Sequence, residues 1–227
     1  MFVNTPVRET LLHVDGSREL SVDLARSVTA LCDTVEAEGH RNAVLYLSGA
    51  PTEKAVGAVA DVTAVSKWEQ AVRRFERLPV PTLAMAEGEC GGAALDLLLA
   101  ADVRIGSSDL RLLPSIYERA TWPGTSSFRL VQQLGLARAR GAVLFGAPIT
   151  ASEALALGLL DRVSPELQRT LEESLELLSR FSGPELAVRR QLAFDAQWMS
   201  FEDALGPHLA ACDRALRQGR AESRAAA

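Results

Sequence analysis

The residues best suited to chemistry lie in one short stretch, residues 86–105, with the sequence AEGECGGAALDLLLAADVRI. There the pair Gly91-Gly92 opens a run of small and apolar residues typical of a buried helix, and Asp96 is the one acid inside it. Backbone N–H groups at the start of a helix have no partner within it and lie at the positive end of its dipole. This turn can therefore aim bare N–H groups at an oxygen that gains negative charge. Alternatively, the glycines only let a strand turn tightly into a packed helix.

Asp96 is the second feature of this stretch that could do chemistry. It follows Gly92 by four residues and so lies on the same face of the expected helix. A buried acid beside a site that binds an oxyanion has a raised pKa and can move protons. An aspartate in the first turn of a helix can equally well only interact with the helix dipole and local amides. The sequence leaves both interpretations open.

Length and composition indicate a globular domain rather than a nucleic-acid or membrane protein. The 227 residues, 48% hydrophobic and 23% charged, are enough for a substantial core in one domain. The net charge of −5, without a long cationic block, argues against a nucleic-acid partner. The longest apolar segments are interrupted by charges, and residues 1–16 do not resemble a signal peptide. We therefore expect a soluble cytoplasmic protein with no membrane partner.

The side chains that most often bind metals are few and scattered. They are Cys32, Cys90, Cys212, His13, His40 and His208. An odd number of widely spaced cysteines is typical of reduced thiols rather than of a disulfide framework. No second ligand stands at metal-binding spacing from any of the histidines, so we expect no metal.

Strands and helices alternate in the first half of the chain. Strands are expected at residues 9–15, 42–51, 82–88 and 102–108, and helices at 21–39, 66–78 and after the glycine pair. The small-residue segment 52–65 is expected to be a loop. Such alternation predicts an α/β fold with a mainly parallel sheet and right-handed crossovers.

The second half of the chain is expected to be almost entirely helical. The expected segments are 126–146, 148–164, 165–181, 183–197 and 200–217. No internal repeat and no linker divides the sequence. We therefore expect one domain, with a core over residues 1–165 and a helical extension of the same domain over 166–227.

Two long runs resemble the crotonase, or enoyl-CoA hydratase/isomerase, superfamily. They are residues 88–102, with the family's glycine spacing followed by ALDLLLAAD, and residues 129–163, RLVQQLGLARARGAVLFGAPITASEALALGLLDRV. The resemblance implies an α/β, crotonase-like β-β-α spiral core and C-terminal helices that assemble a trimer or a dimer of trimers. It also implies a CoA thioester as substrate, with no other cofactor.

In crotonases two backbone amides hold the thioester oxygen and stabilise the enolate or oxyanion. The resemblance assigns the second amide to Ala93, next to Gly92. It assigns the first to Ala60, within AVAD at residues 58–61, where Val59 stands in place of the usual glycine.

The resemblance also assigns the residues that would move protons. Asp96 occupies the position at which the family's hydratases carry a glutamate. In the segment 112–124, Ser115 follows Pro114 where the family often has Pro-Glu. Because serine cannot act as a carboxylate base, we do not expect an ordinary hydratase with two glutamates. Glu118 lies close by and is expected to be a solvated loop acid, although the register of this segment, which is one residue longer than usual, stays open.

Other prominent residues are given structural roles. Trp68 and Phe75, on one helical face, are expected in the core or in a subunit contact. The basic run 73–77 is expected to face solvent, with a CoA phosphate as the alternative partner. The family's adenine-binding loop is shortened here to DGSRELS, residues 15–21. We therefore assign no CoA-binding residue.

The short length of the chain, with residues 65–78 and 182–194, is most similar to an accessory crotonase of the 3,5-dihydroxyphenylacetyl-CoA synthase system. This resemblance implies that the protein assists a type III polyketide synthase, beside a sister crotonase. The step would be dehydration or aromatisation of a poly-β-keto CoA thioester, in the biosynthesis of dihydroxyphenylglycine for glycopeptide antibiotics. Activity alone would be weak or absent. Two alternatives stay open: a free-standing enoyl-CoA hydratase or isomerase, and a non-catalytic crotonase-fold partner that stimulates the synthase.

Overall fold

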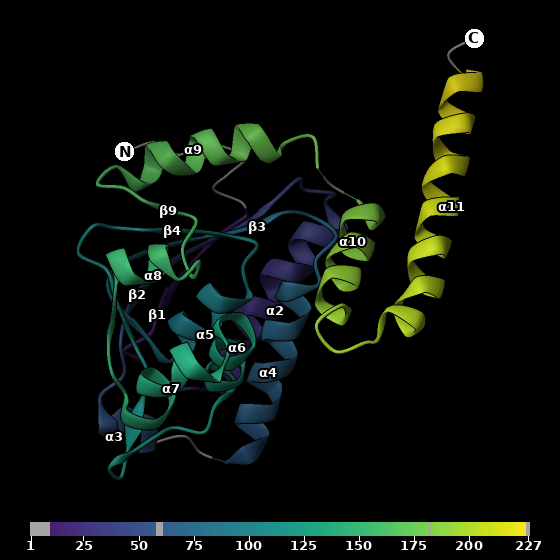
Figure 1. The fold of residues 1–227 in the computed structure, drawn as a ribbon. Coiled ribbons are helices and arrows are strands. Elements are labelled where there is room, and N and C mark those ends of the chain that lie inside the picture. The colour runs from purple at the N-terminus through teal and green to yellow at the C-terminus, as the bar shows by residue number, and fades with distance from the viewer. Residues whose placement is uncertain (1–9, 58–60, 182, 226–227) are drawn as a thin grey trace.

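The structure, a computed structural model, describes residues 10–57, 61–181 and 183–225. In chain order its elements are β1 (Leu11–Asp15), α2 (Val22–Ala37), β2 (Ala43–Gly49), α3 (Glu53–Gly57), α4 (Val62–Glu76), β3 (Thr82–Gly91), α5 (Gly92–Ala100), β4 (Val103–Gly106), β5 (Arg111–Leu113), β6 (Ile116–Tyr117), β7 (Ala120–Thr121), α6 (Thr125–Leu134), α7 (Leu136–Phe145), β8 (Ile149–Thr150), α8 (Ala151–Ala156), β9 (Arg162–Val163), α9 (Leu167–Leu178), α10 (Pro184–Asp195) and α11 (Phe201–Ala225). Figure 1 shows a sheet with helices on both faces and α11 standing away from the body.

The main sheet is largely parallel, as the alternation of strands and helices predicted. Its order is β1-β2-β3-β4-β9, and each neighbouring pair is parallel. The long strand β3 pairs first with β4, and then its last three residues, Glu89–Gly91, pair with β5. β5 in turn pairs antiparallel with β8. Strand β3 therefore changes its neighbour from β4 to β5 near its end, where the chain turns through Gly91 and Gly92 into α5.

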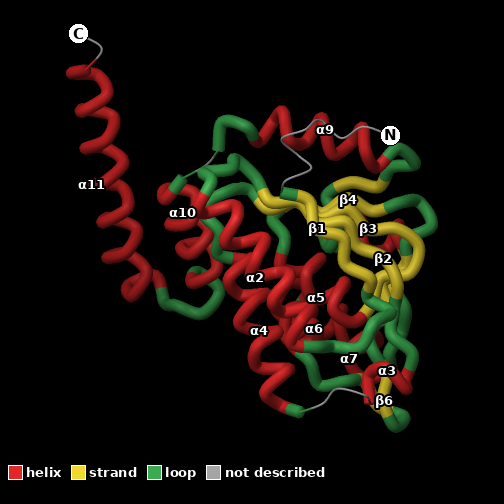
Figure 2. The backbone as a smooth tube through the Cα atoms, turned by 180° about the vertical axis from the view of Figure 1, so that it is seen from behind, coloured by secondary structure: helices red, strands yellow, loops and turns green. Residues whose placement is uncertain are grey.

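Side chains of β3 alternate between two cores because successive residues of a strand point to opposite faces. Ala84 and Ala86 belong to the larger core, whereas Leu83 and Met85 belong to a smaller cluster with Leu171 of α9. In Figure 2, α9 lies on one side of the strands and α2, α4 and α5 lie on the other. The larger core is therefore the one that supports α5 and the glycine turn.

The helix α4 begins earlier than its apolar spacing predicted. The carboxylate of Asp61 accepts a hydrogen bond from the N–H of Ala64 at 3.0 Å, so the helix starts at Val62 rather than near residue 66. The expectation of a loop over residues 52–65 was therefore wrong, because this segment also contains α3. An N-terminal cap of this kind satisfies amides that the first turn leaves unpaired.

The helices of the second half follow the prediction with two departures. The segment 148–164, expected to be helical, contains only the short α8, with β8 before it and β9 after it. The segment 126–146 forms two helices rather than one, because Gly135 adopts a φ of 74° between α6 and α7. The long α11 lies beside α10 and away from the sheet (Figure 1). Among the helices of the described part of the chain, none is long and apolar enough to cross a membrane.

A buried arginine fixes α10 to the core. The guanidinium of Arg190 donates to both carboxylate oxygens of Asp102, at 2.7 and 2.6 Å, and to the carbonyl of Val80 at 3.0 Å. It also donates to the carbonyl of Leu78. The Arg190 side chain is only 6% exposed. Its contacts anchor α10 to the two chain segments that directly precede β3 and β4.

Candidate active site

A small cavity of about 50 Å³ lies at the start of α5, beside the carboxyl ends of β1 and β2. Its wall consists of Arg18, Leu20, Pro51, Ala55, Val56, Gly92, Ala93, Asp96, Ser115, Trp122 and Ser126. Four of the five residues predicted for the site are among them: Gly92, Ala93, Asp96 and Ser115. The fifth, Ala60, lies outside the described residues. The position fits a general rule, because ligands of α/β folds bind at the carboxyl ends of the strands.

The glycine turn is required by the backbone and by its neighbours. Gly92 has a φ of +51°, a conformation that other residues rarely adopt. A Cβ atom at Gly92 would come within 2.9 Å of Cγ of Pro51, and one at Gly91 within 2.7 Å of the Leu113 carbonyl. The interpretation as a tight turn is thus confirmed, and it does not compete with the interpretation as an amide site. The same turn puts the start of α5 on the cavity wall.

The backbone N–H of Ala93 has no hydrogen-bond acceptor within α5. Ala93 is the second residue of α5, so its N–H has no carbonyl one turn back within the helix. No side chain caps this end, because the N-cap position is held by Gly91. An oxygen bound against Ala93 in the cavity would therefore lie at the positive end of the α5 dipole, close to N–H groups that have no partner within the helix.

The carboxylate of Asp96 is held on one side only. Its Oδ2 accepts a hydrogen bond from Nε1 of Trp68 at 2.8 Å. Its Oδ1 is inaccessible to water and has no hydrogen-bond partner among the described residues. Asp96 lies in the second turn of α5, and no hydrogen bond joins it to a helix amide among the described contacts. The interpretation as a first-turn acid that only serves the dipole is therefore not what the structure shows.

The environment of Asp96 favours its neutral form. Burial raises the pKa of Asp96 from 3.8 to about 6, and the negative charge of Glu69 adds to this rise. The hydrogen bond from Trp68, the charge of Arg129 and the hydroxyl of Ser126 act in the opposite direction and lower the pKa. A carboxyl group with a pKa near 6 exchanges protons readily close to neutral pH.

The segment after β5 contributes a hydroxyl and no second acid. Ser115 is half-buried on the cavity wall, and its carbonyl accepts from the N–H of Trp122 at 2.8 Å. Glu118 lies at the exposed tip of the β6–β7 hairpin, with a φ of 48°, and its N–H donates to Glu53 at 2.6 Å. The expectation that Glu118 is a solvated loop acid is confirmed. Asp96 is therefore the only carboxylate on this cavity among the residues that the structure describes.

The sequence did not predict the other residues of the cavity wall, or the contact between Trp68 and Asp96. Trp68 is 1% exposed, so its expected place in the core is confirmed, but its ring N–H also reaches Asp96. A buried indole N–H needs an acceptor, and this requirement was the one signal that could have revealed the contact. Ser126 and Arg18 line the cavity from α6 and from the shortened loop after β1. Nothing in their sequence context distinguished them.

The basic run 73–77 departs in part from its expected role. Arg73 and Arg77 are exposed, as expected for solvent-facing residues. Arg74 instead bridges α4 to α2, with ion pairs to Asp33 at 2.7 Å and Glu36 at 2.5 Å. The expectation of a purely solvated side chain was wrong for Arg74, because the two acids belong to a helix that the sequence did not place beside α4.

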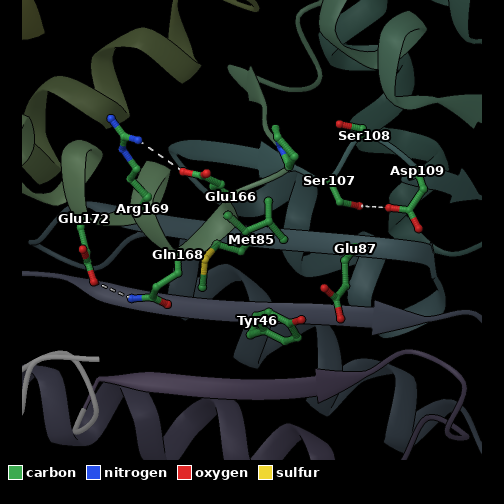
Figure 3. Close-up of a pocket in the computed structure, with 12 residues that line it drawn as sticks. Tyr46, Met85, Glu87, Ser107, Ser108, Asp109, Glu166, Gln168, Arg169 and Glu172 are labelled. Atoms are coloured by element: carbon green, nitrogen blue, oxygen red, sulfur yellow. Dashed lines mark hydrogen bonds and ion pairs between the residues drawn. The ribbon is translucent and has the colours of Figure 1, made fainter. Parts of the chain in front are cut away.

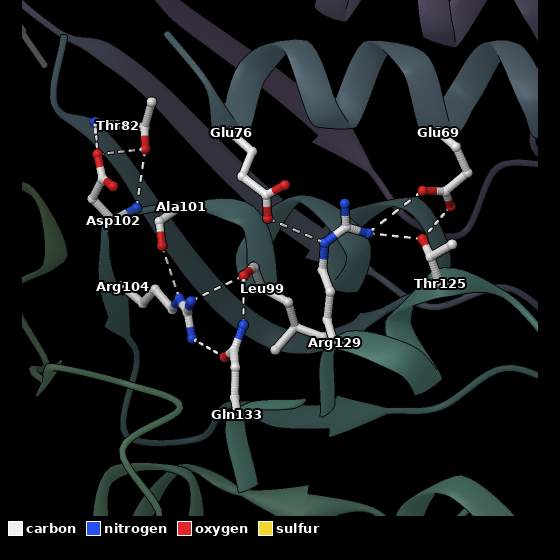
Figure 4. Close-up of polar contacts among 10 residues, drawn as sticks. All are labelled: Glu69, Glu76, Thr82, Leu99, Ala101, Asp102, Arg104, Thr125, Arg129 and Gln133. Atoms are coloured by element: carbon white, nitrogen blue, oxygen red, sulfur yellow. Dashed lines mark hydrogen bonds and ion pairs between the residues drawn. The ribbon is translucent and has the colours of Figure 1, made fainter. Parts of the chain in front are cut away.

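Behind the cavity, a polar network joins α4 to α6 (Figure 4). Arg129 is almost fully buried and donates to the hydroxyl of Thr125 at 2.7 Å. It also lies 3.5 Å from carboxylate oxygens of Glu69 and of Glu76, and Thr125 donates to Glu69. The network thus connects the helix that carries Trp68 to the helix that carries Ser126.

A larger hollow of about 770 Å³ lies on the face of the sheet that α9 covers (Figure 3). Tyr46 and Glu87 lie in it, and burial together with Glu87 raises the pKa of Tyr46 to about 12. None of the predicted site residues lines this hollow, and it contains no unpaired buried side-chain atom among the described residues. The small cavity is therefore the better candidate for chemistry. In the described part of the chain, no three His, Cys, Asp or Glu side chains come together as a metal ion would require.

Comparison with known proteins places this geometry in a family. The sequence model of the enoyl-CoA hydratase/isomerase family matches residues 46–204. A protein of Amycolatopsis orientalis named enoyl-CoA-hydratase is 48% identical over 213 residues, which cover 92% of this chain and 97% of the relative. The chain belongs to the enoyl-CoA hydratase/isomerase family. A probable enoyl-CoA hydratase of Bacillus subtilis is 30% identical over 60% of this chain and 55% of the relative.

Solved structures show that the fold is that of the crotonases. An enoyl-CoA hydratase of Polaromonas sp. JS666 superposes with a TM-score of 0.78 at 18% identity, over 96% of this chain and 92% of that one. A putative enoyl-CoA hydratase of Streptomyces coelicolor A3(2) gives 0.73 at 22% identity, over 96% and 88%. The α/β crotonase fold that the sequence resemblance implied is therefore confirmed. An acyl-CoA substrate is consistent with membership of this family.

Proposed function

We propose that this family member is an accessory crotonase of a type III polyketide synthase. In this role it acts beside a sister crotonase on a poly-β-keto CoA thioester, in the formation of 3,5-dihydroxyphenylacetyl-CoA for dihydroxyphenylglycine and glycopeptide antibiotics. The observation that carries the proposal is that Asp96 is the only acid on the cavity among the residues that the structure describes. The family resemblance puts Ser115, on the same wall, where a hydratase has its second carboxylate. The resemblance of residues 65–78 and 182–194 to such accessory proteins supplies the pathway.

One acid near the amide of Ala93 suffices for loss of water from a β-hydroxy thioester. The carboxylate of Asp96 takes a proton from the carbon next to the carbonyl, while the amide holds the enolate oxygen. The neutral carboxyl then returns this proton to the departing hydroxyl, so that water leaves and the carboxylate is restored. Transfer of the proton to carbon or oxygen elsewhere in the substrate would give tautomerisation toward the aromatic ring.

The size of the cavity supports a site that encloses only the reacting atoms of the substrate. Its volume of about 50 Å³ is far below that of ordinary small-molecule pockets, which enclose about 300–1,000 Å³. The cavity therefore takes the carbonyl and its neighbouring carbon, while the remainder of a long thioester lies outside it. In the same proposal the protein works in the cytoplasm as a trimer or a dimer of trimers.

Reconstitution tests the proposal. A type III polyketide synthase that makes 3,5-dihydroxyphenylacetyl-CoA is supplied with malonyl-CoA and the sister crotonase, and the aromatic product is quantified by chromatography with and without this protein. We expect the protein to raise product formation at least tenfold. An unchanged yield and an unchanged product distribution would exclude the accessory role.

A second candidate is a free-standing enoyl-CoA hydratase or isomerase, and the name of the Amycolatopsis relative favours it. The hydration of crotonyl-CoA distinguishes the two. Because Ser115 cannot replace a carboxylate, we expect negligible hydration by the protein alone. A turnover within a few tens of fold of ordinary enzymes, about 1–1,000 per second, would instead identify it as a hydratase.

A further inference from the structure

We propose that Trp68 is a positioning residue that decides which oxygen of Asp96 carries the proton. The inference rests on the proposed role of Asp96 as the proton carrier and goes beyond it, because it assigns the proton to one atom. The indole N–H of Trp68 donates to Oδ2 at 2.8 Å, and Oδ1 is buried and makes no hydrogen bond among the described residues. The other polar group that acts on this carboxyl from the cavity wall is the hydroxyl of Ser126, which can accept a proton as well as donate one.

The chemistry of the indole group favours one site for the proton. The ring N–H of tryptophan can donate a hydrogen bond but cannot accept one. In a neutral carboxyl group the carbonyl oxygen is the better acceptor, so the Trp68 N–H favours the form with the carbonyl at Oδ2 and the proton on Oδ1. A hydroxyl or a water molecule in the same place could turn and accept a proton from Oδ2, and so would favour neither oxygen. Trp68 can thus only donate a hydrogen bond to Asp96.

The position of Trp68 is itself held firmly. Its side chain is 1% exposed, and it is separated from Asp96 by 28 residues of sequence, on a different helix. The next residue of α4, Glu69, accepts from Thr125 and pairs with Arg129 at 3.5 Å (Figure 4). Arg129 also reaches Glu76, about two turns further along α4, at 3.5 Å. These two ion pairs therefore join α6 to α4, the helix from which the indole projects.

The charged and titratable groups around Asp96 oppose one another. From α4, Glu69 disfavours the charged carboxylate, and from α6, Arg129 favours it. From β3, the buried thiol of Cys90 stays neutral, because burial raises its pKa to about 12. Arg18 lies on the cavity wall from the loop after β1. With these groups unchanged, removal of the indole N–H withdraws a hydrogen bond that favours the charged form.

The substitution Trp68→Phe removes the N–H and keeps an aromatic ring in the core. The readout is the pKa of Asp96, measured by carbon-13 NMR of labelled aspartate carboxyl groups, with the Asp96 signal assigned by its loss in Asp96→Asn. We expect a midpoint near 6 in the unaltered protein and a midpoint higher by about one pH unit or more in Trp68→Phe, because hydrogen bonds to charged groups contribute about 1.5–3 kcal/mol. The pH profile of synthase stimulation should move in the same direction, with a lower kcat and little change in KM.

A matched control is Trp198→Phe, the same substitution at an exposed tryptophan that stacks on Phe128 away from the cavity. We expect this variant to leave the Asp96 midpoint unchanged. If Trp68→Phe does not fold, a tryptophan analogue at position 68 in which sulfur replaces the N–H keeps the ring shape and removes only the donor.

An unchanged Asp96 midpoint in a folded variant that lacks the N–H would overturn the proposal. The outcome is separable from that of the proposed function. If the midpoint moves as expected but the unaltered protein never stimulates a synthase, the accessory role fails while the assignment of the proton to Oδ1 stands.

Discussion

Asp96 combines two features that rarely occur together, because one of its oxygens is paired and the other is buried without a partner. A buried carboxylate in this state disfavours ionisation, and that preference makes the stability of the whole protein depend on pH. The pKa of Asp96 is about 6 in the folded protein and near 3.8 in an unfolded chain. The contribution of the neutral carboxyl is complete only below about pH 3 and is lost as the pH rises through 6.

Asp96→Asn should therefore remove a pH-dependent part of the stability. We expect the free energy of unfolding of the unaltered protein to fall by about 2 kcal/mol between pH 4 and pH 7 relative to the variant. Urea denaturation of both proteins across this range gives the measurement, and all other titrating groups cancel in the difference. Parallel curves for the two proteins would show that Asp96 titrates normally.

At the same scale, sequence reasoning identified the members of the site better than their partners. The glycine pair and Asp96 stand out by residue type and spacing, and family resemblance added Ala93 and Ser115. The partner of Asp96 could not be found in this way, because Trp68 lies on another helix and its apolar surroundings are those of any core residue. Helical periodicity says which face of α4 is buried but not which side chain lies opposite it.

Among the elements, those with long apolar patterns were predictable and those that depend on a single residue were not. The strands β1 to β4 and the helix α2 follow the expected segments closely. The start of α4 depends on the cap at Asp61, and the break between α6 and α7 on Gly135. The strands β5 to β9 contain two or three residues each, which is too short for alternation to be recognised.

The attachment of α10 gives a prediction at this scale. Arg190→Met removes the donor to the carbonyls of Leu78 and Val80 and the cation beside the partly exposed Asp102, and a buried polar group left without its partner costs about 1–3 kcal/mol. We expect a loss of stability of this size, with faster hydrogen exchange over residues 184–195. The neighbouring substitution Arg189→Met, at an exposed position, should change stability by less than about 0.5 kcal/mol. Equal effects of the two substitutions would contradict the anchoring role of Arg190.

For the whole molecule, the parallel sheet followed from the order of the elements, but its turn through β5 did not. That turn depends on β3 continuing past Ala86, where its pairing with β4 ends, so that Glu89–Gly91 pair with β5. Continuous strand pairing of this kind has no signature in residue spacing. Family resemblance conveyed it instead, because the spiral core is a property of the fold as a whole.

The C-terminal helix gives a prediction about assembly. The large apolar side chains Phe201, Leu205, Leu209 and Leu216 of α11 are between 42% and 75% exposed. Apolar surface on this scale is typical of a protein interface. We expect light scattering at micromolar concentration to give the mass of a trimer or of a dimer of trimers. A single species near 24.4 kDa, the mass of one chain, would contradict this expectation.

The central claim is that the cavity at the start of α5 is catalytic, and one measurement tests it directly. Product formation by the partner synthase is compared after addition of equal amounts of unaltered protein, Ala93→Pro or Asp96→Asn. Proline removes the Ala93 N–H yet is tolerated in the first turn of a helix. Circular dichroism serves as the control that both variants are folded.

We predict that Ala93→Pro brings product formation down to the level of the synthase without this protein, because losing one oxyanion donor usually lowers the rate of the catalysed step by about a hundred- to a thousandfold. For Asp96→Asn we predict the same outcome, because general acid–base catalysis contributes about a hundred- to ten-thousandfold to such a step. If both folded variants stimulate the synthase as well as the unaltered protein does, the cavity is not catalytic, and the protein acts as a scaffold for the synthase.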